Sequence, residues 1–208
     1  MPIVPVKVKG WGSGEIITTY ALLNNSSTST WCSESLAMKL GVVGPRIEVS
    51  LSTIKKDCNP TSCHTVCLEI MDMDEINMIE LPEVLTKEKL NIFTDGVACQ
   101  DGANRLSNLS GIHVPERINA EVELLIGQDV PEVLEPSEIR SCRGNGPYAT
   151  KTKFGWTLNW HSGVRDVNFV RADKVLSQQF HHFMNFNLSS ANQFLKQQGQ
   201  YLVKTSKL

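Results

Sequence analysis

Short runs of alternating apolar and polar residues, separated by turn-forming residues, dominate the first 160 of the 208 residues in this chain. The runs are rich in Val, Ile and Thr and cover residues 4–9, 15–23, 47–54, 65–71 and 121–127. β-Branched residues in alternation are typical of strands with one buried face. The sequence GWGSG at residues 10–14 predicts a hairpin between the first two runs. We therefore expect a mainly β fold, with a final strand pair at 148–159.

Two segments depart from the strand pattern. Residues 33–40 (SESLAMKL) predict a short helix that Ser33 caps and Gly41 ends. Residues 173–186 place large apolar side chains at helical spacing, which predicts an amphipathic helix. Residues 91–120 hold scattered Gly, Asn, Asp and Ser and are expected to form a long loop.

The charge balance changes near residue 160. Residues 1–160 hold 14 basic and 20 acidic residues, whereas residues 161–208 hold 6 basic and 2 acidic ones. We therefore expect one domain over 1–160 and a connector or helical tail over 161–208. The net charge of -2 argues against a dedicated nucleic-acid-binding protein.

No run of apolar residues approaches the ~20 that a membrane-spanning helix needs, and the first residues contain no apolar signal-peptide core. We therefore expect no membrane partner and an intracellular, cytoplasmic location. The six cysteines are expected to stay free in such a reducing compartment.

Three separated segments carry a resemblance to a known family. They are ALLNNSST at residues 21–28, LLIGQDVPE at 124–132, and the Gly-Pro-Tyr and Gly-Trp-Thr-Leu-Asn sequences within 146–159. Together they resemble the retropepsin-like aspartic peptidase domain of Bel/Pao-type retrotransposon polyproteins, over residues 1–160. Residues 161–186 are similar to the connector that leads toward the reverse transcriptase.

The resemblance implies a fold, a reaction and an assembly. The implied fold is a small closed β barrel with one or two short helices. The implied reaction is peptide-bond hydrolysis of a polyprotein by a homodimer, with no cofactor and no metal. In the family an Asp-Ser/Thr-Gly triplet follows Leu-Leu, and two such aspartates, one from each chain, share a proton. The ionised carboxylate activates water and the protonated one polarises the scissile carbonyl.

This chain departs from the family at that triplet. Asn24, Asn25 and Ser26 stand at the Asp, Ser/Thr and Gly positions. A carboxamide is not a usable base, so the loss of general-base assistance alone lowers the rate by about 10²–10⁴-fold or more. A serine in place of a glycine is expected to strain the turn, by roughly 1–3 kcal/mol if the glycine conformation is kept. Asn25 removes a hydroxyl that bonds across the dimer interface in the family.

The resemblance also implies substrate contacts. A flap hairpin is expected from residues 47–54 and 64–70, with a tip at 55–60 that lacks glycine. The residues implied for substrate binding are Ser27, Ile54, Lys55, Lys56, Ile126 and Gly127. Asp129 is interpreted as structural, capping the turn before Pro131.

The function has open alternatives. The main hypothesis is an aspartic endopeptidase domain that is inactive in this chain because Asn24 replaces the catalytic Asp. A second is a non-catalytic module that binds extended peptides by β-addition, or that forms mixed dimers with an active homologue. A third is a non-functional fragment of a decayed element.

Two other groups of side chains can be interpreted either as functional sites or as ordinary structural residues. Cys58, Cys63, His64 and Cys67 could bind zinc, but their spacing matches no common zinc motif. Alternation along a strand puts Cys63 and Cys67 on one face and His64 on the other, so ordinary strand residues are favoured. Two acids in the 91–120 loop, Asp95 and Asp101, could form a relocated catalytic pair, but nothing in the sequence positions them.

Overall fold

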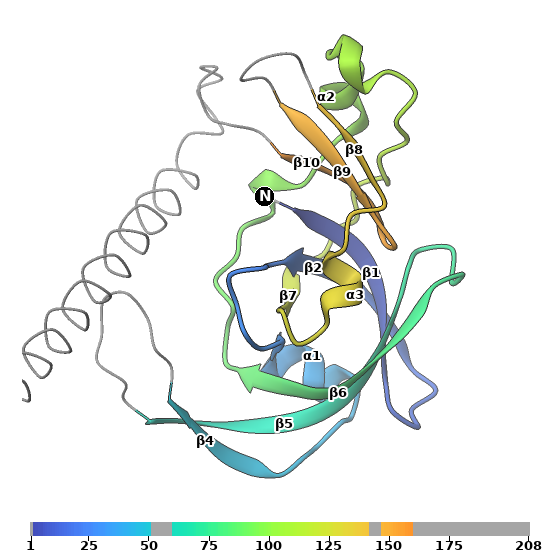
Figure 1. Cartoon of the computed structure of the whole chain (residues 1–208). Coiled ribbons are helices and arrows are strands. Elements are labelled where there is room, and N and C mark those ends of the chain that lie inside the picture. Colours follow the sequence, from blue (N-terminus) through green and yellow to red (C-terminus); the bar gives the residue numbers. More distant parts are fainter. Residues whose placement is uncertain (1, 51–59, 142–146, 160–208) are drawn as a thin grey trace, which may run out of the picture. The chain divides into compact units, whose positions relative to one another are not determined.

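The computed structural model describes residues 2–50, 60–141 and 147–159 (Figure 1). Nearly all of them, residues 2–49, 61–141 and 147–159, belong to one compact unit. The predicted helix at 173–186, the connector and most of the flap tip lie outside the described residues.

The chain begins with the predicted hairpin. Strand β1 (Ile3–Gly10) pairs antiparallel with β2 (Ile16–Leu23), with Val6 opposite Thr19. Gly12 lies in the connecting turn at a φ of +75°, a conformation that favours glycine. The hairpin prediction is confirmed.

Six strands close into a barrel, which confirms the expected mainly β architecture. The others are β3 (Trp31–Ser33), β5 (Pro60–Met71), β6 (Met78–Lys87) and β7 (Val122–Ile126). Their order is β1-β2-β7-β3-β6-β5, and β1 pairs with β5 to close the ring. Strand β4 (Arg46–Ser50) pairs with β5 and is the last strand in the order of this sheet. The largest buried apolar cluster includes Val6, Leu68, Leu124 and Ile126, and it forms the main core.

Two strands of the barrel run parallel and side by side. Strands β2 and β7 pair Leu22 with Leu125 and Leu23 with Ile126. Parallel neighbours cannot be joined by a tight turn, so the chain makes a long crossover between them. Because both strands end at the same level, the loops that follow them emerge together.

The predicted helix is present as α1 (Glu34–Lys39). Its N-cap, Ser33, accepts a hydrogen bond from the Leu36 N–H at 2.9 Å, and Gly41 follows at a φ of +65°. The buried Glu123 carboxylate accepts hydrogen bonds from the Ser33 hydroxyl at 3.1 Å and from Lys39 Nζ at 3.0 Å. One side chain of β7 therefore holds both ends of α1.

A second sheet contains β8 (Glu138–Arg140), β9 (Tyr148–Thr152) and β10 (Gly155–Asn159), in the order β10-β9-β8. The predicted final strand pair is thus confirmed by the β9–β10 pairing. Trp156 packs in a small cluster with Ala103 and Leu109.

The 91–120 segment differs from the prediction of a long loop. It contains the 3-10 helices η1 (Thr94–Gly96) and η2 (Ser107–Leu109) and the helix α2 (Gln100–Asn104). With α1 and α3 (Pro131–Leu134), the described part of the chain has three short α-helices rather than one or two. Elements this short show no periodicity, and the N-cap of α2, Cys99, makes no side-chain capping bond that a sequence signal could reveal.

The cysteine-rich strand β5 does not alternate as predicted. Cys63 is buried, whereas Cys67 and His64 are both exposed, so Cys63 and Cys67 do not share a face. The pairing of β5 with β6 shifts register between Val66 and Leu68, and such an irregularity breaks simple alternation. The described residues contain no group of three metal-binding side chains. Cys58 lies outside them.

Cys32, Cys63, Cys67 and Cys99 carry free thiols. Within the part of the chain that the structure describes, no helix has the length and apolar character needed to cross a lipid bilayer.

Candidate functional site

The triplet at residues 24–26 lies directly after β2. The Asn24 N–H donates to the Ile126 carbonyl at 2.8 Å, which extends the contact between the two parallel strands by one residue. Asn25 and Ser26 form an exposed turn, which the Ser27 N–H closes by donating to the Asn24 carbonyl at 3.1 Å. The three predicted catalytic positions therefore lie at the end of the paired strands β2 and β7.

The Asn24 side chain is half-buried and bonded within the turn. Its Oδ1 accepts a hydrogen bond from the Ser26 N–H at 3.0 Å. A carboxamide at this place can accept and donate hydrogen bonds but cannot exchange a proton with water at neutral pH.

The strain predicted at Ser26 is absent. Among the described residues other than glycine, only Glu75 and Asn91 have a positive φ. Ser26 is thus in an ordinary conformation, in which a serine costs no more than most residues. The condition for the strain, a conformation that favours glycine, is therefore not met at Ser26.

A brace of hydrogen bonds holds the Asn24 loop against the loop after β7. The Asp129 carboxylate accepts from the Thr30 N–H and from the Thr30 hydroxyl, both at 2.7 Å. The Gly127 N–H in turn donates to Thr30 Oγ1 at 3.1 Å. Bonds to an ionised acceptor are stronger than neutral ones. Asp129 is therefore structural, as predicted, but its partner is Thr30 rather than the turn before Pro131.

The two loops approach so closely that Gly127 has no room for a side chain. A Cβ atom there would lie 2.5 Å from the Ser29 carbonyl oxygen and 2.9 Å from that of Ser27. The Gln128 N–H donates to the Ser27 carbonyl at 2.8 Å, and Gln128 Nε2 donates to the Asn25 carbonyl. The arrangement fixes the backbone of the Asn24 loop from Asn25 to Thr30.

The residues predicted to bind substrate fall into three groups by where the structure places them. Ser27 and Gly127 lie in the two braced loops beside Asn24. The Ile126 side chain is fully buried in the barrel core, so Ile126 offers this site only its carbonyl. Ile54, Lys55 and Lys56 lie outside the described residues.

Sequence reasoning missed Thr30 and Gln128 as parts of the site. Thr30 is a buried polar residue in a run of Ser and Thr, where no local pattern marks one hydroxyl as special. Its partner Asp129 lies 99 positions away. Only the parallel pairing of β2 with β7 brings the two residues together.

A thiol close to this region does not replace the missing acid. Cys32 in β3 is fully buried. Burial, and then the negative charges of Glu123 and Glu34, raise the pKa of Cys32 to about 12. The reactive thiolate is therefore scarce at neutral pH, which excludes Cys32 as a ready nucleophile.

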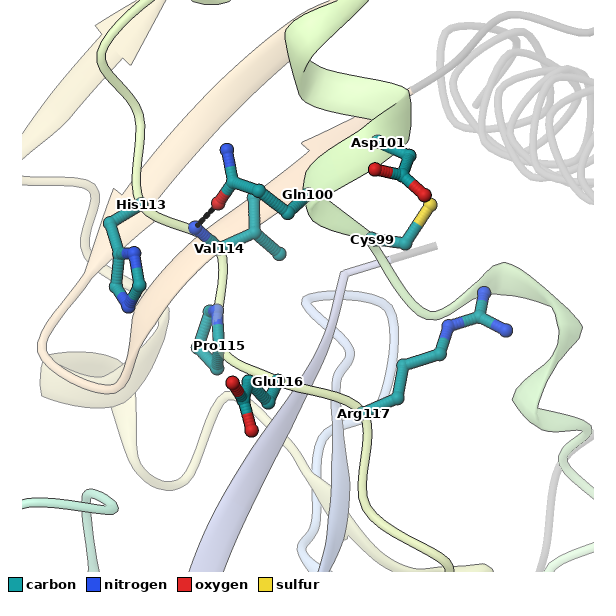
Figure 2. A pocket seen from close by; sticks show the side chains of 8 residues that line it. All are labelled: Cys99, Gln100, Asp101, His113, Val114, Pro115, Glu116 and Arg117. Carbon is teal, nitrogen blue, oxygen red and sulfur yellow. Dashed lines mark hydrogen bonds between the residues drawn. The ribbon is translucent and has the colours of Figure 1, made fainter.

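A separate pocket of about 330 Å³ lies at α2 and the segment that follows it (Figure 2). It is lined by Cys99, Gln100, Asp101, His113, Val114, Pro115, Glu116 and Arg117. The Val114 N–H donates to Gln100 Oε1 at 2.8 Å, and Arg117 Nη2 donates to the Val97 carbonyl at 2.8 Å. No residue of the Asn24 or Gly127 loops lines this pocket. Asp101, one of the two acids considered for a relocated catalytic pair, lines it.

No protein-family model matches this chain. No curated protein matches it either.

Proposed function

We propose that residues 1–160 are a retropepsin-like aspartic endopeptidase domain of the Bel/Pao retrotransposon type, inactive in this copy because Asn24 replaces the catalytic Asp. The observation that carries the proposal is the brace between the loops after β2 and β7. The loop is held by Thr30, Asp129 and Gly127, and it presents one half-buried side chain, Asn24, at the end of a barrel strand. This is a scaffold for a single precisely placed group, which the resemblance identifies as a carboxylate.

The chemistry of hydrolysis explains the loss of activity. Water attacks a peptide carbonyl far faster when a base removes its proton, and a paired carboxylate is the base in this class of site. Asp129 is the carboxylic acid within the brace, and both of its oxygens accept hydrogen bonds from Thr30. It therefore serves the scaffold and does not replace the base.

The proposal requires two copies of the chain. One loop brings one position for a catalytic acid, so a pair of carboxylates needs a second loop from a partner. Asn25 and Ser26 are exposed beside Asn24, which leaves this turn accessible to a second molecule. The proposed substrate is an extended peptide or polyprotein segment.

A second candidate function is a peptide-binding module without catalysis. Strand β4 has β5 as its one neighbour among the described strands. An edge strand offers unpaired backbone groups to which an extended peptide can add as a further strand. A third candidate is a relic with neither activity.

The reversion series Asn24→Asp, followed by Asn24→Asp with Ser26→Gly, separates these functions. We expect peptide cleavage from the Asn24→Asp chain, with little further gain from Ser26→Gly, because Ser26 is not strained. Sedimentation shows whether the chain dimerises, and peptide capture by the unaltered chain tests the binding module. A double revertant that dimerises and cuts no peptide contradicts the peptidase proposal.

A further inference from the structure

The turn after β2 contains two adjacent asparagines, Asn24 and Asn25, whose hydrogen bonds differ in the folded chain. Asparagine deamidates when the backbone nitrogen of the next residue attacks the side-chain carbonyl carbon. We infer that Asn24 is a site of spontaneous deamidation, which generates a carboxylate at the start of the braced loop. The modification itself does not rest on the proposed function.

The sequence alone points to the other asparagine. Attack is easiest when the following residue is small, because a bulky neighbour hinders the cyclic imide. Asn25 is followed by Ser26, whereas Asn24 is followed by the larger Asn25. An unfolded chain should therefore deamidate faster at Asn25 than at Asn24.

The folded turn protects Asn25. Attack on Asn25 requires the backbone nitrogen of Ser26, whose N–H donates to Asn24 Oδ1 at 3.0 Å. The Asn25 carbonyl is also held, because it accepts a hydrogen bond from Gln128 Nε2. Rotation of this peptide toward the Asn25 side chain would break both contacts.

The same bond activates Asn24. A hydrogen bond to Asn24 Oδ1 draws electron density from the side-chain carbonyl and stabilises the oxyanion that forms on attack. The attacking group is the backbone nitrogen of Asn25, an exposed residue whose N–H donates no hydrogen bond within the described parts of the chain. The Asn25 nitrogen thus has no competing hydrogen bond of its own, and one contact, from the Ser27 N–H to the Asn24 carbonyl at 3.1 Å, restrains its peptide. The electrophile is polarised.

The reaction balances with water as the only co-reactant. The Asn25 nitrogen loses its proton and bonds to Cγ of Asn24, and the Cγ–Nδ2 bond breaks with release of ammonia. Water then adds to Cγ and the bond from Cγ to the Asn25 nitrogen breaks. The proton returns to the Asn25 nitrogen, and residue 24 is an aspartate.

The braced loop suits that product. A carboxylate at residue 24 keeps the hydrogen bond from the Ser26 N–H, and such a bond favours the ionised form. Opening of the imide at the other carbonyl inserts a methylene into the backbone. That insertion would disturb the bonds of residue 24 to Ile126 and Ser27, so aspartate is the product that preserves the loop.

One consequence does rest on the proposed function. If the loop is that of an aspartic peptidase, two deamidated chains in one dimer supply the missing pair of carboxylates. Aged preparations of the unaltered chain would then gain pepstatin-sensitive cleavage as residue 24 is converted.

Peptide mapping by mass spectrometry tests the inference on the full chain. The folded chain and the same chain in concentrated urea are incubated at mildly alkaline pH, and fragment spectra locate each exchange of –NH2 for –OH. Asn145-Gly146, the most labile pair in the sequence, serves as the reference for chemical ageing. We expect Asn24 to be converted before Asn25 in the folded chain, and the reverse order in urea.

Variants separate the modification from the activity. Asn24→Gln should remove the reaction, because a glutamine side chain forms its larger ring slowly. Asn25→Gln should leave the conversion of Asn24 in place. Equal or preferred conversion of Asn25 in the folded chain, or an unmodified Asn24 after Asn145 has reacted, would overturn the inference. Conversion of Asn24 without cleavage would instead leave the inference standing and count against the peptidase proposal.

Discussion

The Asp129 carboxylate receives both the N–H and the hydroxyl hydrogen of Thr30 at 2.7 Å, although the two residues lie 99 positions apart. This contact joins the loop that follows β2 to the loop that follows β7. It depends on the parallel pairing of β2 with β7 within the barrel. The geometry of the Asn24 turn is thus a property of the completed fold.

Removal of the Asp129 carboxylate should destabilise the domain. Asp129→Ala leaves the buried Thr30 N–H and hydroxyl without their acceptor, at a cost of roughly 1–3 kcal/mol. Asp129→Asn keeps one acceptor oxygen and should cost less. Urea unfolding measures both, and Asp74→Ala at an exposed turn position is the matched control. Equal stability of the Asp129→Ala and Asp74→Ala chains would contradict the brace.

Gly127→Ala should also lower stability. The added Cβ would lie 2.5 Å from the Ser29 carbonyl oxygen, so one of the two loops must move, at a cost on the order of 1–3 kcal/mol. Gly14→Ala is the control, because a Cβ at Gly14 has no atom within 4 Å. Unfolding midpoints in urea check the comparison. A Gly127→Ala chain as stable as the Gly14→Ala chain would show that the loops do not meet as described.

The burial of Cys32 predicts a loss of stability at alkaline pH. The folded-state pKa is raised from 9.0 to about 12, so between these values the unfolded chain has lost a proton that the folded chain still holds. Unfolding therefore becomes more favourable as pH rises through this window, and the contribution is fully present below pH 9. Between about pH 8, below this window, and about pH 10.5, within it, stability should decline less for Cys32→Ala than for the unaltered chain. Equal declines would indicate an accessible thiol.

Much of the barrel could be predicted from local sequence. Alternation with a GWGSG turn predicted the β1–β2 hairpin, and the Ser33 cap with Gly41 predicted α1, because each signal acts over a few residues. Helix α2 was missed, since it is five residues long and its cap residue makes no side-chain bond.

The candidate site was harder to predict than the fold. The positions of Asn24, Ser27 and Gly127 follow from strand ends, but the role of Thr30 depends on a contact across 99 positions. The strain expected at Ser26 is absent because the Asn24 side chain and backbone shape the turn without a positive φ. The exposure of Cys67 escaped prediction because the register shift between β5 and β6 leaves no local sequence signal.

The central proposal is that the described barrel and its braced loop cut peptides once an acid stands at residue 24. The most direct measurement is peptide cleavage by freshly prepared Asn24→Asp chain, compared with unaltered chain whose Asn24 is verified as unmodified by mass. Asn25→Asp, which puts the same charge one residue along, is the control. We predict pepstatin-sensitive cleavage by the Asn24→Asp chain at least about 10²-fold above both of the others. Pepstatin-sensitive cleavage by the unmodified chain, or an Asn24→Asp chain no more active than Asn25→Asp, would contradict the account.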